Sequence, residues 1–213
     1  MTASTQDHLA KLIDRIAKFP HVVVAFSGGV DSSVVAAAAA RGLCQQRGCL
    51  QSVKLATAVS PALASWQRQT AAAVAKDLDV PHVWVETDEL SSEGYRRNEG
   101  SRCFYCKQSL YRHLEQISSQ FGDTCTILSG TNADDLGDHR PGLTAGRLAN
   151  VRTPLADLHL NKSMIRQIAR AMQLRSADTP ASPCLSSRIA YGTPVTRQRL
   201  EWIDASECLL RDH

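Results

Sequence analysis

A long apolar run that ends in a glycine turn limits this chain to few folds. Residues 21–26 read HVVVAF, residues 27–33 read SGGVDSS, and an alanine-rich stretch follows at 34–40. A near-continuous β-branched run is typical of a strand that is covered on both faces in a parallel sheet. The sequence therefore predicts an α/β fold in which the first strand and its helix flank a tight loop.

Strand and helix signals alternate along the rest of the chain. After a first helix that Pro20 ends, the expected strands lie at residues 53–59, 82–86 and 124–129, and the expected helices at 63–78, 107–121, 162–174 and 197–210. Such alternation indicates βαβ units with right-handed crossovers, and hence a doubly wound, mostly parallel sheet. Because ligands of these sheets bind beyond the carboxyl ends of the strands, we expect the functional residues in the loops that follow the strands.

Length, charge and cysteine content narrow the class of protein. The 213 residues fit one full α/β domain, expected at residues 1–178, plus the start of a smaller C-terminal part at 179–213. A net charge of +3 counts against a protein that wraps a long nucleic acid. The apolar stretches are far below the roughly 18 residues that cross a bilayer, and no signal-peptide core is visible, so a cytoplasmic protein without membrane contact is expected. Seven cysteines, an odd number, favour metal or sulfur chemistry over a disulfide framework.

The SGGVDSS turn, called the phosphate loop below, has the composition of an anion site. A turn between a strand and its helix presents several backbone N–H groups and the positive end of the helix to one point. Gly28 and Gly29 allow the backbone to approach a phosphate closely, and the hydroxyls of Ser27, Ser32 and Ser33 add donors. A plain glycine turn that joins strand to helix is the simpler alternative. The loop is not a Walker loop, because the GxxxxGK[ST] spacing is absent.

The phosphate loop resembles the PP-loop of the ATP-pyrophosphatase superfamily. That resemblance implies that ATP is cleaved between its α and β phosphates. Asp31 is the acidic member of the loop, and a carboxylate in an anion site is unfavourable unless it caps the loop or holds a cation. We therefore assign Asp31 to loop geometry or to a magnesium ion; the loop alone does not identify the acceptor.

A second polar loop, called the acidic turn below, follows the strand predicted at 124–129. Residues 130–143 read GTNADDLGDHRPGL, and they offer oxygen ligands for magnesium and a guanidinium for a phosphate from Asn132, Asp134, Asp135, Asp138 and Arg140. We predict that Gly130, Asn132, Asp135 and Arg140 join the phosphate loop in binding the nucleotide. An ordinary solvated loop with Asx turns is the alternative. For a second basic group, at Arg96, Arg97 and Arg102, a solvated face is at least as good an interpretation.

Three cysteines have the spacing or setting of a sulfur or metal site. Cys103 and Cys106 (CFYC) can chelate one metal or cluster, and Cys184 lies in SPCLSSR within a proline-rich stretch. Zinc normally takes four ligands, for which His139 or Cys125 could serve as the fourth, whereas a [4Fe-4S] cluster held by three thiolates leaves one iron open for an extra sulfide. The remaining cysteines are interpreted as structural: Cys44, Cys49, Cys125 and Cys208.

Taken in order, SGGVDSS, CFYC, GTNADDLGDHRPGL and SPCLSSRIAYGTPVT closely resemble the LarE family of ATP-dependent sulfurtransferases, over about residues 9–210. The resemblance implies that the chain AMPylates a carboxylate of pyridinium-3,5-biscarboxylic acid mononucleotide and converts it to a thiocarboxylate, in the biosynthesis of the nickel-pincer nucleotide cofactor. It also implies a homo-oligomer, typically a ring of six, and a further segment after the C-terminal part.

Carried over residue by residue, the resemblance places the ATP phosphates at residues 27–33. Cys184 falls on the sulfur-bearing cysteine of the family, and Ser187 and Arg188 fall on its substrate-phosphate segment. Some members give up the sulfur of that cysteine and end with dehydroalanine. Others carry a [4Fe-4S] cluster on three cysteines, and the match at Cys103, Cys106 and Cys184 favours this version.

Other functions compete with this interpretation. A tRNA thiolation enzyme uses the same loop, but the low net charge and the absence of a basic RNA-binding appendage count against it. A nucleotide-binding module without turnover would keep the same fold. A glutamine-dependent amidating ligase is disfavoured, because 213 residues leave no room for a glutaminase domain. We therefore expect a small-molecule substrate, with ATP and magnesium.

Overall fold

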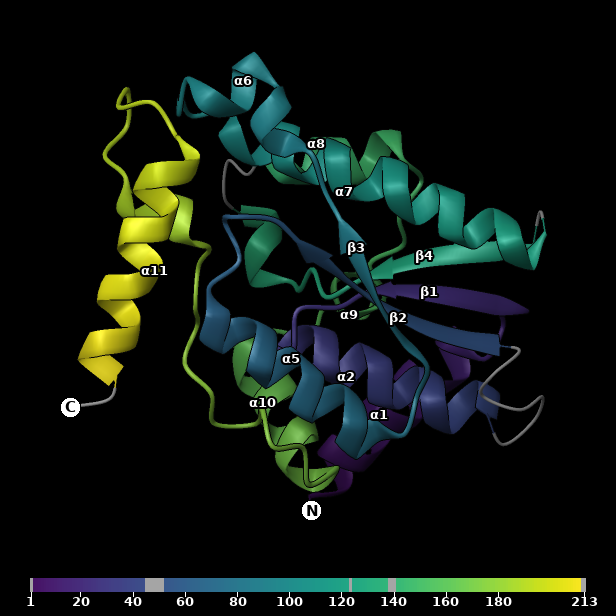
Figure 1. Ribbon diagram of the computed structural model, residues 1–213. Coiled ribbons are helices and arrows are strands. Elements are labelled where there is room, and N and C mark those ends of the chain that lie inside the picture. Colours follow the sequence, from purple (N-terminus) through teal and green to yellow (C-terminus); the bar gives the residue numbers. More distant parts are fainter. Residues whose placement is uncertain (1, 45–51, 123, 138–140, 212–213) are drawn as a thin grey trace.

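The sheet confirms the predicted α/β class. The computed structural model describes residues 2–44, 52–122, 124–137 and 141–211. Four strands, all parallel to their neighbours, form a sheet in the order β3-β2-β1-β4 (Figure 1). Their bounds are β1 (His21–Ala25), β2 (Val53–Val59), β3 (His82–Glu86) and β4 (Cys125–Ser129).

Helices cover both faces of the sheet (Figure 1). One face carries α1 (Ala3–Ile16), α2 (Val30–Ala39), α5 (Ser65–Leu78), α9 (Pro154–Asp157) and α10 (Lys162–Ala171), and the other carries α7 (Arg102–Ser118) and α8 (Pro141–Leu148). Two further helices, α6 (Glu93–Arg96) and α11 (Arg197–Arg211), lie on the side where the strands end. Within the described ranges, no helix combines the length and apolarity that crossing a membrane requires.

The first strand is buried on both faces, as its β-branched sequence predicts. Val22 and Val24 pack into the core formed with α2 and α5, while Val23 packs into the core formed with α7. Because α2 is itself covered by α1 and α10, nearly all of its residues are buried, which explains its small side chains. Ala25 pairs in register with Ala56 on one side and with Ser129 on the other, so the loops after β1 and β4 leave the same edge of the sheet.

The sequence placed the strands accurately but placed one helix start wrongly. The helix expected at residues 107–121 begins at Arg102, so Cys103 and Cys106 lie inside its first turns and not in a loop before it. The first turn was missed because its buried residue is Arg102, a charged side chain that breaks the apolar spacing of an amphipathic helix. The irregular stretch expected at 179–194 contains only the short 3-10 helix Leu185–Arg188.

The C-terminal part packs against the loops at the carboxyl edge of the sheet. A third buried cluster joins the two regions and consists of Ala62, Ala64, Tyr95, Leu185, Ile189, Val195 and Leu200. Backbone hydrogen bonds link the same segments, from the Leu185 amide to the Ala62 carbonyl at 2.9 Å and from the Val195 amide to the Arg96 carbonyl at 2.8 Å. The segment that carries Cys184 is therefore anchored beside the strand ends.

Candidate functional site

The phosphate loop closes only with glycine at position 28. Gly28 has a φ of +75°, a left-handed conformation that side chains rarely adopt. A Cβ atom at this position would also lie 2.7 Å from the Cα atom of Ala71 on α5. The loop therefore packs directly against α5, and Gly29 caps the start of α2. The positive end of α2 thus faces the strand ends, where it favours an anion.

The serine hydroxyls hold the phosphate loop in shape. Ser32 Oγ and Ser33 Oγ both donate to the Gly29 carbonyl oxygen, at 3.0 and 2.8 Å. The Ser27 amide donates to Ser32 Oγ at 3.2 Å, and the Gly29 amide donates to Ser27 Oγ at 3.3 Å. Since a hydroxyl has one proton, those of Ser32 and Ser33 are used within the loop. A contact of these hydroxyls with phosphate stays a prediction.

Asp31 has one paired oxygen and one without a partner. Its Oδ2 accepts from Lys162 Nζ at 2.5 Å, and the two side chains are only 24% and 34% exposed. Its Oδ1 is buried and has no hydrogen-bond partner among the residues that the structure describes. A buried carboxylate oxygen without a partner costs free energy, and a hard cation is the ligand that such an oxygen suits. The Oδ1 atom of Asp31 is therefore suited to bind a hard cation such as magnesium.

Lys162 is a site residue that the sequence analysis missed. It is the first residue of α10, and the Asn161 side chain caps this helix by accepting from the Met164 amide at 3.0 Å. The Asn161 cap is a sequence signal for the helix start. The contact with Asp31 has no such signal, because it joins residues 131 positions apart.

The acidic turn is an Asx turn that is tied to α10. Asn132 Oδ1 accepts from the amides of Asp134 and Asp135, at 2.9 and 3.3 Å, and Asp135 Oδ2 accepts from the Asn132 amide at 3.0 Å. Asp134 Oδ2 accepts from the Lys162 amide at 2.9 Å. Several side-chain oxygens that were predicted to bind a ligand therefore accept hydrogen bonds that stabilise the turn itself. Three other predicted residues lie outside the described residues: Asp138, His139 and Arg140.

The acidic turn and the phosphate loop share one rim, as predicted. A Cβ atom on Gly130 would lie 2.7 Å from the Ser32 amide nitrogen and 3.1 Å from Asp31 Cβ. The end of β4 therefore passes directly beside the start of α2, and only glycine allows this approach. Gly130 thus shapes the site through its backbone.

The structure brings Cys106 and Cys184 to one neighbourhood. Both are half-buried and pack against the cluster that contains Tyr95 and Leu185, while Cys103 is exposed one turn earlier on α7. Burial raises the pKa of the Cys106 thiol to about 12. Cys106 is therefore a neutral thiol at neutral pH.

The predicted iron-sulfur cluster does not fit the arrangement of these donors. Within the described ranges, no three His, Cys, Asp or Glu side chains form a group that could hold a metal ion. Cys125, considered above as a fourth ligand, begins β4 opposite His21, so it lies at the other edge of the sheet from Gly130.

The residues after Cys184 hold its backbone in place. Ser187 Oγ donates to the Cys184 carbonyl oxygen at 2.5 Å. Arg188 Nη1 donates to the carbonyl oxygens of Pro183 and Cys184, at 2.8 and 3.3 Å, and Arg188 Nε donates to Glu207 Oε1 at 2.6 Å. Both side chains that the sequence assigns to a substrate phosphate therefore brace the loop around Cys184.

A buried polar group, missed by the sequence analysis, joins α7 to the segment that follows Cys184. Arg102 Nη1 donates to Asn98 Oδ1 and, at 2.8 Å, to the Ser186 carbonyl oxygen. Asn98 Nδ2 donates to the Ala190 carbonyl oxygen at 2.8 Å, and the Tyr95 hydroxyl lies 2.6 Å from Ser186 Oγ. The solvated-face interpretation was thus wrong for Arg102, which is 6% exposed, because folding turns this side chain inward against the C-terminal part.

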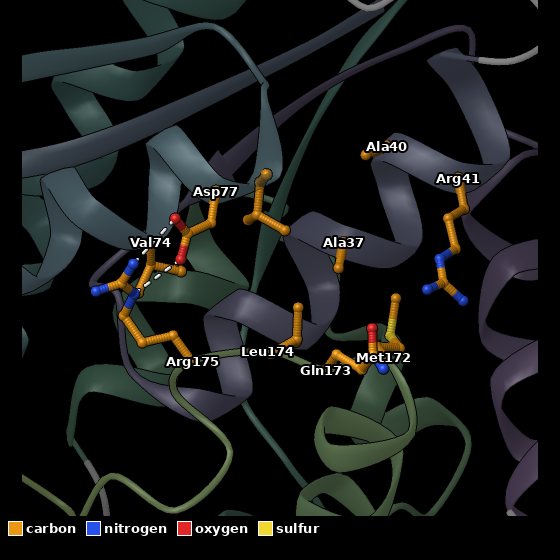
Figure 2. A pocket seen from close by; sticks show the side chains of 10 residues that line it. Ala37, Ala40, Arg41, Val74, Asp77, Met172, Gln173, Leu174 and Arg175 are labelled. Atoms are coloured by element: carbon orange, nitrogen blue, oxygen red, sulfur yellow. Dashed lines mark hydrogen bonds and ion pairs between the residues drawn. The ribbon is translucent and has the colours of Figure 1, made fainter.

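A surface hollow at the C-terminal end of α2 lies away from this site. Figure 2 shows the residues that line it, at the C-terminal ends of α2 and α5. Its volume is about 250 Å³. Its walls include Ala37 and Arg41, and Asp77 pairs with Arg175 at 2.7 Å across it. Since the phosphate loop precedes α2, the hollow lies at the opposite end of that helix.

Comparison with known proteins gives a family and a fold. The sequence profile of the asparagine synthase family matches residues 6–136 of this chain, more than half of its length. The NH3-dependent NAD synthetase of Campylobacter jejuni has a similar structure, with a TM-score of 0.64 and 20% sequence identity over 80% of this chain and 74% of that one. This structural similarity supports the α/β fold.

Two proteins are similar in sequence to nearly the whole of this chain. An uncharacterised protein of Synechocystis is 35% identical over 206 residues, which are 97% of this chain and 74% of that protein. The pyridinium-3,5-bisthiocarboxylic acid mononucleotide synthase of Lactiplantibacillus plantarum is 29% identical over 202 residues, which are 95% of this chain and 71% of that enzyme. The similarity therefore extends beyond the profile match into the segment that carries Cys184.

Proposed function

This chain belongs to the asparagine synthase family, and we propose that it is an ATP-dependent sulfurtransferase of the LarE type. It activates a carboxylate of pyridinium-3,5-biscarboxylic acid mononucleotide with AMP, releases pyrophosphate and replaces AMP with sulfur. Residues 1–178 supply the ATP-binding domain, and residues 179–213 supply the start of the sulfur-transfer region. The similarity to the Lactiplantibacillus plantarum bisthiocarboxylic acid mononucleotide synthase supports this substrate.

One observation carries the proposal: a single helix contacts both the phosphate loop and the loop of Cys184. Gly28 packs on Ala71 of α5. Gln67, one turn earlier on α5, donates through Nε2 to the Ser182 carbonyl oxygen at 3.0 Å and to the Pro183 carbonyl oxygen at 3.4 Å. An activated carboxylate formed at the phosphate loop would therefore lie near the cysteine.

Activation of the carboxylate takes place at the phosphate loop. An oxygen of the substrate carboxylate attacks the α-phosphorus of ATP, the bond from that phosphorus to the bridging oxygen breaks, and pyrophosphate leaves. The loop backbone and the start of α2 stabilise the charge that develops on pyrophosphate, and Lys162 Nζ adds a cation beside Asp31. Magnesium held by Asp31 Oδ1 would neutralise further charge on this leaving group.

Cys184 then supplies the sulfur. Its thiolate attacks the acyl carbon, the bond from that carbon to AMP breaks, and a thioester joins substrate and enzyme. Loss of the Cys184 Cα proton to a base in the solvent then cleaves the Cβ–S bond. The substrate keeps a thiocarboxylate and the chain keeps dehydroalanine, so the protein loses one hydrogen sulfide in total.

The test is pyrophosphate release with ATP, magnesium and the pyridinium dicarboxylate nucleotide. Wild-type protein releases pyrophosphate and forms thiocarboxylate, whereas Cys184→Ala releases pyrophosphate without thiocarboxylate. Cys208→Ala, a half-buried cysteine of α11, is the matched control and behaves as wild type. Pyrophosphate release that requires bulk tRNA instead of the nucleotide, or no release at all, would overturn the proposal.

Anaerobic purification separates the two sources of sulfur. Sulfur from Cys184 itself requires no iron. A content of about four irons per chain that is lost in Cys103→Ala, Cys106→Ala and Cys184→Ala alike would instead show that the sulfur comes from an iron-sulfur cluster.

A further inference from the structure

A second hollow lies between the start of α7 and the residues that follow Cys184. Its volume is about 250 Å³, and it is lined by Arg102, Ser187, Arg188, Ile189, Ala190 and Tyr191. Ser187 joins this hollow to the sulfur site, because its hydroxyl donates to the Cys184 carbonyl oxygen. A molecule in the hollow would therefore lie next to the cysteine backbone.

Among the residues that the structure describes, one positive charge in the hollow has no counter-charge. Two guanidinium groups line it, and Arg188 is paired with Glu207. Arg102 is 6% exposed, and among the described residues its acceptors are neutral: Asn98 Oδ1 and the Ser186 carbonyl oxygen. A buried cation without an anion is costly, so this guanidinium is the group in the hollow that most needs an anionic ligand.

Arg102 also has the geometry to bind an oxyanion. Only its Nη1 atom is used in the hydrogen bonds to Asn98 and Ser186. A guanidinium carries five N–H donors, so the edge formed by Nε and Nη2 has donors left within this part of the chain. That edge matches the two oxygens of a carboxylate or phosphate in a bidentate pair.

Tyr191 supplies an aromatic surface at the same place. Its side chain is 76% exposed, and its ring centroid lies 5.9 Å from the Arg102 guanidinium carbon. An exposed tyrosine ring presents a negative face that attracts a flat cation. A pyridinium ring that carries an anionic substituent matches both features of the hollow.

We propose that Arg102 binds an oxyanion of the substrate nucleotide, either its phosphate or a carboxylate, while the pyridinium ring lies against Tyr191. This assignment rests on the proposed function, because it takes the pyridinium nucleotide as the ligand. It gives Arg188 a different role from the one predicted from sequence: Arg188 positions the loop of Cys184 through Glu207 and the Pro183 carbonyl group.

Calorimetric titration with two pyridine nucleotides and one pyridine nucleoside tests the assignment without turnover. Nicotinic acid mononucleotide carries both a phosphate and a carboxylate, nicotinamide mononucleotide carries the phosphate only, and nicotinic acid riboside carries the carboxylate only. Arg102→Lys keeps the charge but loses the bidentate edge, and it should weaken nicotinic acid mononucleotide at least about tenfold. The single-anion probe whose affinity is unchanged in Arg102→Lys carries the anion that Arg102 does not bind.

One control variant, a second test variant and a control ligand accompany this titration. Arg97→Lys changes an exposed arginine that pairs with Glu93, and it should leave all three affinities unchanged. Tyr191→Ala changes an exposed side chain, so it decides the matter where Arg102→Lys does not fold, and it should weaken all three probes. AMP binding at the phosphate loop should be the same in every variant.

The outcomes separate this inference from the proposed function. Wild-type protein that binds none of the probes, or Arg102→Lys and Tyr191→Ala variants that bind them as wild type does, would overturn the assignment. The protein could also bind the probes through Arg102 and yet release no pyrophosphate with any pyridinium nucleotide. That result would support the assignment of Arg102 and overturn the proposed sulfurtransferase function.

Discussion

The phosphate loop and the segment around Cys184 lie at the same edge of the sheet but are held in different ways. The loop at residues 27–33 is shaped largely by its own hydroxyls and by glycine. The Cys184 segment is held by residues remote in sequence, notably Gln67, Asn98 and Arg102. The shape of the phosphate loop therefore depends on a local motif, whereas the placement of Cys184 depends on tertiary contacts that substitution can remove separately.

The largest effect is expected in the phosphate loop. Gly28→Ala adds a side chain at a φ of +75° and 2.7 Å from the α5 backbone, which should lower the free energy of unfolding by about 3 kcal/mol. Pyrophosphate release should be lost with it. Gly100→Ala is the matched control, because beyond its chain neighbours no atom of the described residues lies within 4 Å of its added Cβ. Equal urea midpoints for the two variants would show that the loop is not packed as described.

The next effect concerns the Cys184 segment. Asn98→Ala removes three hydrogen bonds to the carbonyl oxygens of Ile189, Ala190 and Thr193 and the one that its Oδ1 accepts from Arg102, which should lower the free energy of unfolding by about 2 kcal/mol. The reactivity of Cys184 toward iodoacetamide should change, while ATP binding should not. Asn150→Ala is the control, because this exposed asparagine has a similar positive φ. Loss of ATP binding in Asn98→Ala would show that the two regions do not respond to substitution independently.

A smaller effect is expected where the phosphate loop meets α10. Lys162→Met leaves the Asp31 carboxylate without its cation, and we expect pyrophosphate release to fall about tenfold, since a charge-assisted hydrogen bond is lost. Lys11→Met removes an exposed ion pair with Asp7 and should leave the rate unchanged. An unchanged rate in Lys162→Met would place the phosphates away from Lys162.

The smallest effect is a difference in thiol reactivity. Burial raises the pKa of Cys106 to about 12 from a usual value of 9.0, so its neutral form is stabilised by folding. That stabilisation is complete below about pH 9 and is lost as the pH rises toward 12. At pH 8 the exposed Cys103 should react with iodoacetamide well before Cys106, as peptide mass mapping would detect. Equal rates would mean that Cys106 is an accessible thiolate and would favour a cluster.

The phosphate loop was predictable because its strand, turn and helix are contiguous in sequence. The β-branched run, the paired glycines and the alanines that follow each carry a local physical meaning. The strand boundaries at Val53–Val59 and His82–Glu86 could be read for the same reason.

The rest of the site depends on long-range contacts that no local pattern contains. Lys162 reaches Asp31 across 131 positions, and Arg102 reaches the Ser186 carbonyl oxygen across 84. A charged side chain is normally exposed, so a basic group before CFYC predicts a solvated face. Only the folded chain shows that Arg102 is buried and that Arg188 is paired with Glu207.

The most direct test of the account is the intact mass of the protein after one turnover with ATP, magnesium and the pyridinium dicarboxylate nucleotide. We expect a loss of one hydrogen sulfide, located at Cys184 by peptide mapping and matched by one thiocarboxylate per chain. Thiocarboxylate formed while the mass of the Cys184 peptide stays unchanged would contradict it.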